Sequence, residues 1–241
     1  MPVPQRMRLF TIPNLMTCGN LLCGCLGIVC SFRGDLLLAG ALIFVAAVLD
    51  FFDGFAARLL NQSSPIGKEL DSLADMVTFG VLPSMIVFQY LERTNDSIEI
   101  EGMLVSFVAF LLAIFSALRL AKFNIDTRQA DSFIGVPTPA NAIVVASLPF
   151  ILRAYPELQS MIVNSTVLIG YTLVMSFFMV MEVPLLAFKF KSFAWKDNQL
   201  KYIFLGLSVV LLILLKFAAI PLIVGIYILL SIIAPKSPKG A

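Results

Sequence analysis

The sequence predicts an all-α membrane protein, because apolar residues dominate it, charged residues are scarce, and the apolar stretches have the length of helices. Of its 241 residues, 59% are hydrophobic and 13% are charged, and the mean hydropathy is +0.95. Soluble domains contain about 25% charged residues. No linker, repeat or low-complexity segment divides the chain, so we expect residues 1–241 to form a single membrane-embedded domain.

About eight transmembrane helices are predicted, because the apolar stretches approach the ~20 residues that cross a bilayer. The predicted helices cover residues 14–31, 36–60, 69–91, 101–122, 138–153, 160–182, 200–216 and 218–234. The fifth and seventh are short. Only Lys216 and the residues before Pro221 separate the last two, so seven spans is the alternative.

The basic residues predict the orientation. With an even number of spans, 13 of the 17 Lys and Arg residues fall on the side that holds both termini, and 4 fall on the other side. Basic residues are enriched in cytoplasmic connections. We therefore expect both termini to be cytoplasmic, in the inner or plasma membrane of a prokaryote.

Four aspartates lie within this apolar helical sequence, at Asp50, Asp53, Asp71 and Asp75. Carboxylates at membrane depth are costly and usually mark function. Residues three or four apart share a helix face, so two helices offer two carboxylates each. All-oxygen ligation favours a hard divalent cation such as Mg²⁺ or Mn²⁺. The chain has no histidine, which excludes histidine-based phosphoryl transfer.

The spacing of these aspartates resembles a family signature. Residues 50–75 read D-x2-D-G-x2-A-R-x8-G-x3-D-x3-D, which is similar to the signature of the CDP-alcohol phosphatidyltransferases at all eight defined positions. Residues 119–140 contain R-L-A-x-F-N followed by F-x-G-x-P-x-P-A, which resembles the phosphatidylserine synthase branch. The resemblance implies transfer of the phosphatidyl group of CDP-diacylglycerol to L-serine, with release of CMP. Glycerol 3-phosphate or an inositol phosphate as the acceptor, and transport of a divalent cation, remain alternatives.

The resemblance also implies roles for individual residues. Two metal ions, Mg²⁺ or Mn²⁺, are expected, one held by Asp50, Asp53 and Asp71 and the other by Asp50, Asp71 and Asp75. Asp71 and Asp75 are the expected catalytic residues, with Asp75 as the general base. Contacts to CDP-diacylglycerol are expected from Asn14, Thr17, Gly54, Arg58 and Ser64. A homodimer is also expected, as in other members of the family.

The acceptor site is expected in the segment that follows the fourth predicted helix. A zwitterionic amino acid requires a cation for its carboxylate. The candidates are Arg119, Lys122, Asn124 and Arg128, although a basic cluster on the cytoplasmic side would explain the same charges. A second basic and aromatic stretch, residues 188–201, predicts an anchor on anionic lipid and no nucleic-acid partner.

Overall fold

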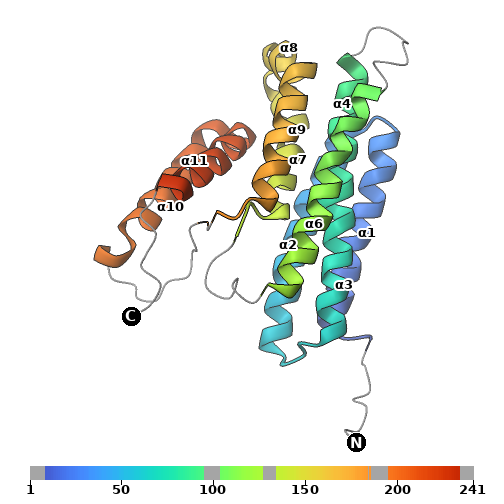
Figure 1. Cartoon of the computed structure of the whole chain (residues 1–241), viewed down its shortest axis with the longest axis vertical. Helices are drawn as coiled ribbons and strands as arrows, with labels where there is room; N and C mark the ends of the chain where they lie inside the picture. Colours follow the sequence, from blue (N-terminus) through green and yellow to red (C-terminus); the bar gives the residue numbers. More distant parts are fainter. Residues whose placement is uncertain (1–8, 95–103, 127–133, 184, 186–194, 234–241) are drawn as a thin grey trace, which may run out of the picture.

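The computed structural model describes residues 9–94, 104–126, 134–183, 185 and 195–233, and helices make up most of them (Figure 1). The longer helices are α1 (Ile12–Phe32), α2 (Leu36–Leu59), α3 (Pro65–Asp75), α4 (Leu82–Thr94), α6 (Leu111–Ile125), α7 (Thr138–Ala154), α9 (Ser165–Val180), α10 (Trp195–Leu215) and α11 (Ala219–Ile233). Shorter helical segments are η1 (Met76–Val81), η2 (Phe107–Phe110), η4 (Pro156–Leu158), α8 (Gln159–Ile162) and η5 (Lys216–Ala218).

Helices α1 and α2 form an antiparallel pair joined by a tight turn. Gly34 has a φ of +81° in this turn, a conformation that glycine adopts without steric cost. Asp35 then caps α2, because its side chain accepts a hydrogen bond from the N–H of Leu38 at 3.0 Å. The antiparallel arrangement brings the start of α1 beside the end of α2, at the lower end of the bundle in Figure 1.

A continuous helical rod follows, in which α3 passes through the π-helical segment η1 into α4. The rod lies close to α1 because α1 has glycines where the two approach. A Cβ at Gly24 would overlap the Thr78 side chain, and a Cβ at Gly27 would overlap Leu82. Small residues of this kind allow membrane helices to pack closely. The close packing holds Asp75, the last residue of α3, against α1.

The prediction of an all-α membrane protein is confirmed. Among the described residues, five helices are long and apolar enough to cross a membrane, or six if a bent helix pair counts as one span. Large apolar side chains are exposed on several helices, among them Leu22, Val45, Phe177 and Ile213. Such an apolar exterior suits lipid, whereas water would drive it to associate.

The predicted number of eight spans is not confirmed, because only five or six helices among the described residues have the length and apolar composition of a span. Helix α7 has 17 residues and is therefore shorter than the other spans. The predicted helix over residues 160–182 is bent instead, because Pro156–Ile162 and Ser165–Val180 meet at 68°. Asn164 starts the second part, since its side chain accepts hydrogen bonds from the N–H groups of Thr166 and Val167.

The apolar stretch from Asn198 to Ile233 is 36 residues long but is not one straight helix. The rings of Phe204 and Tyr227 lie 6.1 Å apart, although a straight helix would separate them by about 35 Å. Lys216 has a φ of +50° between the two limbs. Helices α10 and α11 therefore fold back on each other. Phe217, between them, stacks on Phe150 of α7, with the two ring centroids 4.4 Å apart.

Candidate metal and substrate site

The four aspartates of the signature lie where α1, α2 and α3 meet, toward the end of the bundle that holds the start of α1 (Figure 1). Asp50 and Asp53 belong to the last three turns of α2, and Asp71 and Asp75 belong to the second half of α3. The two helices run past each other after the turn between Leu60 and Ser64. Side chains 18 or more residues apart in sequence are brought to one place by this turn.

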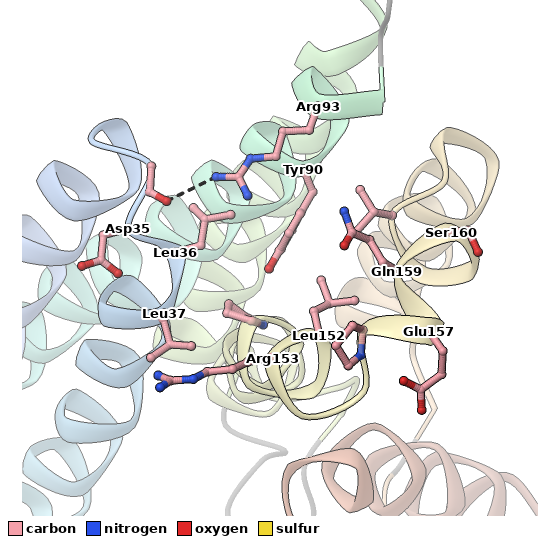
Figure 2. A pocket seen from close by; sticks show the side chains of 14 residues that line it. Asp35, Leu36, Leu37, Tyr90, Arg93, Leu152, Arg153, Glu157, Gln159 and Ser160 are labelled. Atoms are coloured by element: carbon pink, nitrogen blue, oxygen red, sulfur yellow. Dashed lines mark hydrogen bonds between the residues drawn. The ribbon is translucent and has the colours of Figure 1, made fainter.

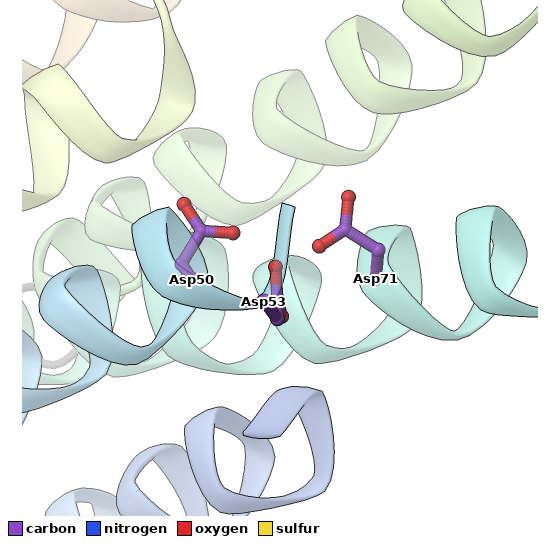
Figure 3. Close-up of side chains that lie close together, drawn as sticks. All are labelled: Asp50, Asp53 and Asp71. Atoms are coloured by element: carbon purple, nitrogen blue, oxygen red, sulfur yellow. The ribbon is translucent and has the colours of Figure 1, made fainter. Parts of the chain in front are cut away.

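Three of the carboxylates form a compact group. Asp50, Asp53 and Asp71 each offer an oxygen, and these three oxygens lie within 4.8 Å of one another. Figure 3 shows Asp50 and Asp71 pointing toward the same space, with Asp53 between them. Asp53 is buried, and Asp50 and Asp71 are half-buried. Partial burial limits how well water can screen the repulsion among the three charges.

Asp75 lies one turn beyond this group. It is within interaction distance of Asp50, and its Oδ1 accepts a hydrogen bond from Asn20 Nδ2 on α1 at 3.3 Å. Asp75 is 8% exposed and Asn20 is fully buried. Among the described residues, Asn20 Oδ1 has no hydrogen-bond partner. One amide group therefore holds the carboxylate and leaves a buried acceptor oxygen beside it.

Helix α1 also holds Asp53. Thr17 Oγ1 donates a hydrogen bond to Asp53 Oδ2 at 2.6 Å. The Thr17 hydroxyl also lies 3.1 Å from the carbonyl oxygen of Pro13, so it is enclosed by polar groups on both sides. The hydroxyl thus fixes the rotamer of one carboxylate in the group of three.

A cleft of about 230 Å³ opens beside the carboxylates. Its walls come from the start of α1, the end of α2, and the turn that leads into α3. The lining residues are Pro13, Asn14, Thr17, Asp53, Gly54, Ala57, Gln62, Ser63, Ser64, Gly67, Lys68 and Asp71. A Cβ at Gly54 would have no atom within 4 Å, so this wall of the cleft is open space.

The predicted substrate contacts are only partly in this cleft. Asn14, Thr17, Gly54 and Ser64 line it, whereas Arg58 is exposed and is absent from its walls. Ser64 also has a structural role, because its Oγ accepts a hydrogen bond from the N–H of Gly67 at 3.1 Å and caps α3.

The donor set suits a hard divalent cation. The three grouped side chains offer only carboxylate oxygens, with no sulfur or nitrogen donor among them. Oxygen donors of this kind are typical ligands of Mg²⁺ and Mn²⁺. A cation would also offset the repulsion of three or four carboxylates in partly buried surroundings. The residues present therefore fit such an ion.

The residues predicted for the acceptor are separated by the structure. Arg119 is 7% exposed, donates from Nη1 to Thr138 Oγ1 at 3.2 Å, and lies within charge–charge range of Asp75. Its Nε is buried and has no hydrogen-bond partner among the described residues. Lys122, by contrast, forms an ion pair with Glu182 at 2.9 Å.

The structure gives no comparable reason to assign the acceptor to the other two candidates. Asn124 joins α6 to α3, since its Nδ2 donates to Ser72 Oγ at 2.9 Å and its carbonyl oxygen accepts from Lys68 Nζ at 2.9 Å. Arg128 lies outside the described residues.

Sequence reasoning missed Asn20, Gln62 and Lys68 as members of the site. A signal for Asn20 was present, because it follows Thr17 by three residues and so lies on the same face of α1. Lys68 carries the same signal on α3, because it precedes Asp71 by three residues. Gln62 carries no such periodic signal, and only the turn between α2 and α3 places it at the cleft.

The chain is similar in sequence to a known protein family. A model of the family described as CDP-alcohol phosphatidyltransferase matches residues 10–178, a range that holds all four aspartates, the cleft and Arg119. A protein of Helicobacter pylori named CDP-diacylglycerol–serine O-phosphatidyltransferase is 34% identical over 227 residues, which cover 93% of this chain and 91% of that protein.

Two further relatives are similar over a shorter part. A Bacillus subtilis protein with the same name is 42% identical over 139 residues, covering 58% of this chain and 75% of that protein. An archaetidylserine synthase of Methanothermobacter thermautotrophicus is 29% identical over 151 residues, covering 62% of this chain and 61% of that protein.

Proposed function

Because the chain belongs to the CDP-alcohol phosphatidyltransferase family, we propose that it transfers the phosphatidyl group of CDP-diacylglycerol to L-serine. The products are phosphatidylserine and CMP. The observation that carries the proposal is the group formed by Asp50, Asp53 and Asp71 at the edge of a polar cleft in an otherwise apolar protein. The names of the relatives in Helicobacter and Bacillus support serine as the acceptor.

The cleft would hold the nucleotide part of the lipid substrate. Its floor offers the amide of Asn14 and the hydroxyls of Ser63 and Ser64, and Lys68 adds a positive charge. Gly54 leaves open space where a side chain would otherwise stand. The acyl chains would stay in the bilayer, while the diphosphate would lie beside Asp50, Asp53 and Asp71.

Two divalent cations, Mg²⁺ or Mn²⁺, would be held by Asp50, Asp53 and Asp71 and by Asp50, Asp71 and Asp75. They would supply positive charge to neutralise the diphosphate and the departing CMP. Thr17 orients Asp53 through its 2.6 Å hydrogen bond.

Asp75 is proposed to act as the general base. It would accept the proton of the serine hydroxyl as that oxygen attacks the phosphorus next to the diacylglycerol. The bond from this phosphorus to the oxygen of CMP breaks, and CMP leaves with its phosphate. Asn20 holds Asp75 in place through the 3.3 Å hydrogen bond. A positioned base of this kind contributes about 10²–10⁴ in rate.

Arg119 is the candidate in this structure that best suits the serine carboxylate. It is buried, it lies near Asp75, and its Nε has no hydrogen-bond partner among the described residues. Guanidinium groups bind carboxylates in a two-pronged geometry. Lys122 is less suited to this role because Glu182 already pairs with it. Asn124 and Arg128 stay secondary candidates.

The proposal extends to the assembly. Residues 1–241 would form one domain in the inner or plasma membrane of a prokaryote, with both termini and the site on the cytoplasmic side. The excess of basic residues on that side supports the orientation. Homodimerisation is part of the same proposal.

The test is CMP release by the purified chain in detergent with CDP-diacylglycerol and Mn²⁺ or Mg²⁺. L-serine, glycerol 3-phosphate, inositol phosphate or no acceptor would be supplied in parallel. Serine-dependent release, reduced about 10²–10⁴-fold by Asp75→Asn, is the expected result. Asp35→Asn is the matched control, because Asp35 caps α2 at the other end and asparagine caps a helix equally well.

Two other outcomes of the CMP-release experiment would contradict the proposal in part or in full. Release that depends on a different alcohol would keep the reaction class and overturn serine as the acceptor. No release with any acceptor, combined with flux of divalent cations through vesicles that contain the chain, would replace the enzyme by a cation transporter.

A further inference from the structure

A second and larger cavity lies at the opposite end of the bundle from the aspartates. Its volume is about 820 Å³. It is formed by the turn before α2, the end of α4, the end of α7, and the segment that contains α8 (Figure 2). The proposed transfer reaction uses none of its lining residues.

The position of this cavity relates it to the membrane. Leu36 lines it at the start of α2, whereas Asp53 lies 17 residues later on the same helix, a rise of about 26 Å. The hydrocarbon core of a bilayer is about 30 Å thick. The cavity therefore lies near the membrane surface opposite the aspartates, at the depth where lipid phosphates lie.

The chemistry of the cavity suits an anion. Two arginines line it, Arg93 from α4 and Arg153 from α7. In Figure 2 their guanidinium groups flank the first turn of α2. The first N–H groups of a helix have no acceptor within the helix and carry partial positive charge. Arg93 Nη2 donates to the Gly34 carbonyl oxygen at 3.2 Å, which leaves its other donors available.

Tyr90 provides a further polar group in the cavity lining. The residue is 4% exposed, and Figure 2 shows its hydroxyl directed into the space between the two arginines. Among the described residues, no hydrogen-bond partner of this hydroxyl is present. The hydroxyl oxygen itself is not fully buried, so it can donate a hydrogen bond to a molecule held in the cavity.

The two acidic residues at the cavity do not compete for the same space. The Asp35 carboxylate is engaged by the N–H of Leu38. The Glu157 carboxylate points away from Tyr90 in Figure 2. Apolar side chains also line the cavity, namely those of Leu36, Leu37 and Leu152. An anion bound between the arginines would thus have an apolar surface beside it.

We propose that this cavity binds the phosphate of a membrane phospholipid in the leaflet opposite the aspartates. Arg93 and Arg153 would hold the phosphate, and Tyr90 would donate to one of its oxygens. The acyl chains would leave the cavity past its apolar lining, which includes Leu37 and Leu152. Free phosphate has the same anionic chemistry but lacks the chains, so it serves as the comparison.

The test uses the full chain in detergent micelles, titrated with phosphatidylglycerol, with bound lipid counted by native mass spectrometry. The double variant R93Q/R153Q is expected to need at least about tenfold more lipid for half-saturation than the unchanged chain. Arg33→Gln is the matched control, because Arg33 is a neighbouring exposed arginine that does not line the cavity. Equal lipid binding by all three proteins would overturn the proposal.

Two further arms complete the test. Millimolar inorganic phosphate is expected not to displace the lipid, and displacement would overturn the assignment to a lipid. If the double variant does not fold, Tyr90→Phe replaces it, since this change removes only a hydroxyl. It is expected to weaken lipid binding about fivefold, and unchanged binding by this variant would also overturn the proposal.

Discussion

Thr17 Oγ1 on α1 donates a 2.6 Å hydrogen bond to Asp53 Oδ2 on α2, although 36 residues separate the two along the chain. Three residues after Thr17, Asn20 donates to Asp75 on α3 at 3.3 Å. One face of α1 therefore holds one carboxylate from each of the two helices that carry the aspartates. This relationship means that α1 positions two of the four aspartates.

Thr17→Val is expected to raise the Mn²⁺ concentration needed for half-maximal CMP release by about 10–100-fold. The change keeps the shape of the side chain but leaves Asp53 without its orienting donor. Loss of a partner that orients a metal ligand typically costs this much affinity. Thr17→Ser, which keeps the hydroxyl, is expected to stay close to the unchanged chain. An unaltered Mn²⁺ requirement in Thr17→Val would contradict the positioning role.

Removal of divalent cations is expected to abolish CMP release, and added Mg²⁺ or Mn²⁺ is expected to restore it. The physical reason is that Asp50, Asp53 and Asp71 cannot bring a diphosphate close without positive charge between them. The measurement is release after treatment with a chelator, followed by titration with each ion. Full activity in the presence of excess chelator would rule out the proposed metal site.

Asn20→Leu is expected to lower kcat about tenfold or more with little change in the KM for serine. Leucine has nearly the same volume but cannot donate to Asp75, so the proposed base loses its fixed position. A hydrogen bond to a charged group is worth about 1.5–3 kcal/mol, and 1.4 kcal/mol corresponds to a factor of ten. Steady-state kinetics at saturating CDP-diacylglycerol would separate the two parameters. A raised KM with an unchanged kcat would instead assign Asn20 to substrate binding.

Arg119→Lys is expected to raise the KM for serine at least about tenfold, because lysine lacks the planar fork that binds a carboxylate. The comparison is Lys122→Glu with Glu182→Lys, which exchanges the two charges of the ion pair. This exchange is expected to change the KM for serine less than about threefold, since a partly exposed pair contributes only about 0–1 kcal/mol. If the exchange raised the KM and Arg119→Lys did not, Lys122 would be the residue that holds the acceptor.

Gly24→Ala is expected to destabilise the chain by about 1–3 kcal/mol, because the added Cβ overlaps Thr78 and the helices must move apart. Gly170→Ala is the matched control on α9. A Cβ at Gly170 meets nothing within 4 Å, so this change is expected to be neutral or slightly stabilising. Thermal unfolding of both variants in the same detergent measures the difference. Equal unfolding midpoints would show that α1 and η1 do not require the close approach.

Much of the fold and of the candidate site could be predicted from the sequence. The apolar composition was enough for the all-α membrane prediction, because a bilayer requires apolar helices of a set length. The family resemblance read from residues 50–75 is confirmed by the family match over residues 10–178. The site residues and their roles stay predictions. The spacing of the aspartates was informative because both pairs follow the helical repeat.

Details that depend on helix ends and bends could not be predicted in the same way. Asn164 starts a new helix inside the predicted stretch 160–182, and the competition between a side-chain cap and a continuing helix depends on neighbouring packing. The reversal of chain direction at Lys216, between α10 and α11, could not be predicted either. Hydropathy alone does not separate one long apolar helix from two short ones.

Composition and spacing along the chain therefore determined the class of fold, the family, and the identity of the clustered carboxylates, because these depend on local residue types. The tertiary structure decided which residues meet. It placed Asn20 on Asp75, paired Lys122 with Glu182, moved Arg58 away from the cleft walls, and opened the second cavity around Tyr90. Contacts of this kind arise where helices far apart in sequence cross, and their geometry depends on the packing of the whole bundle.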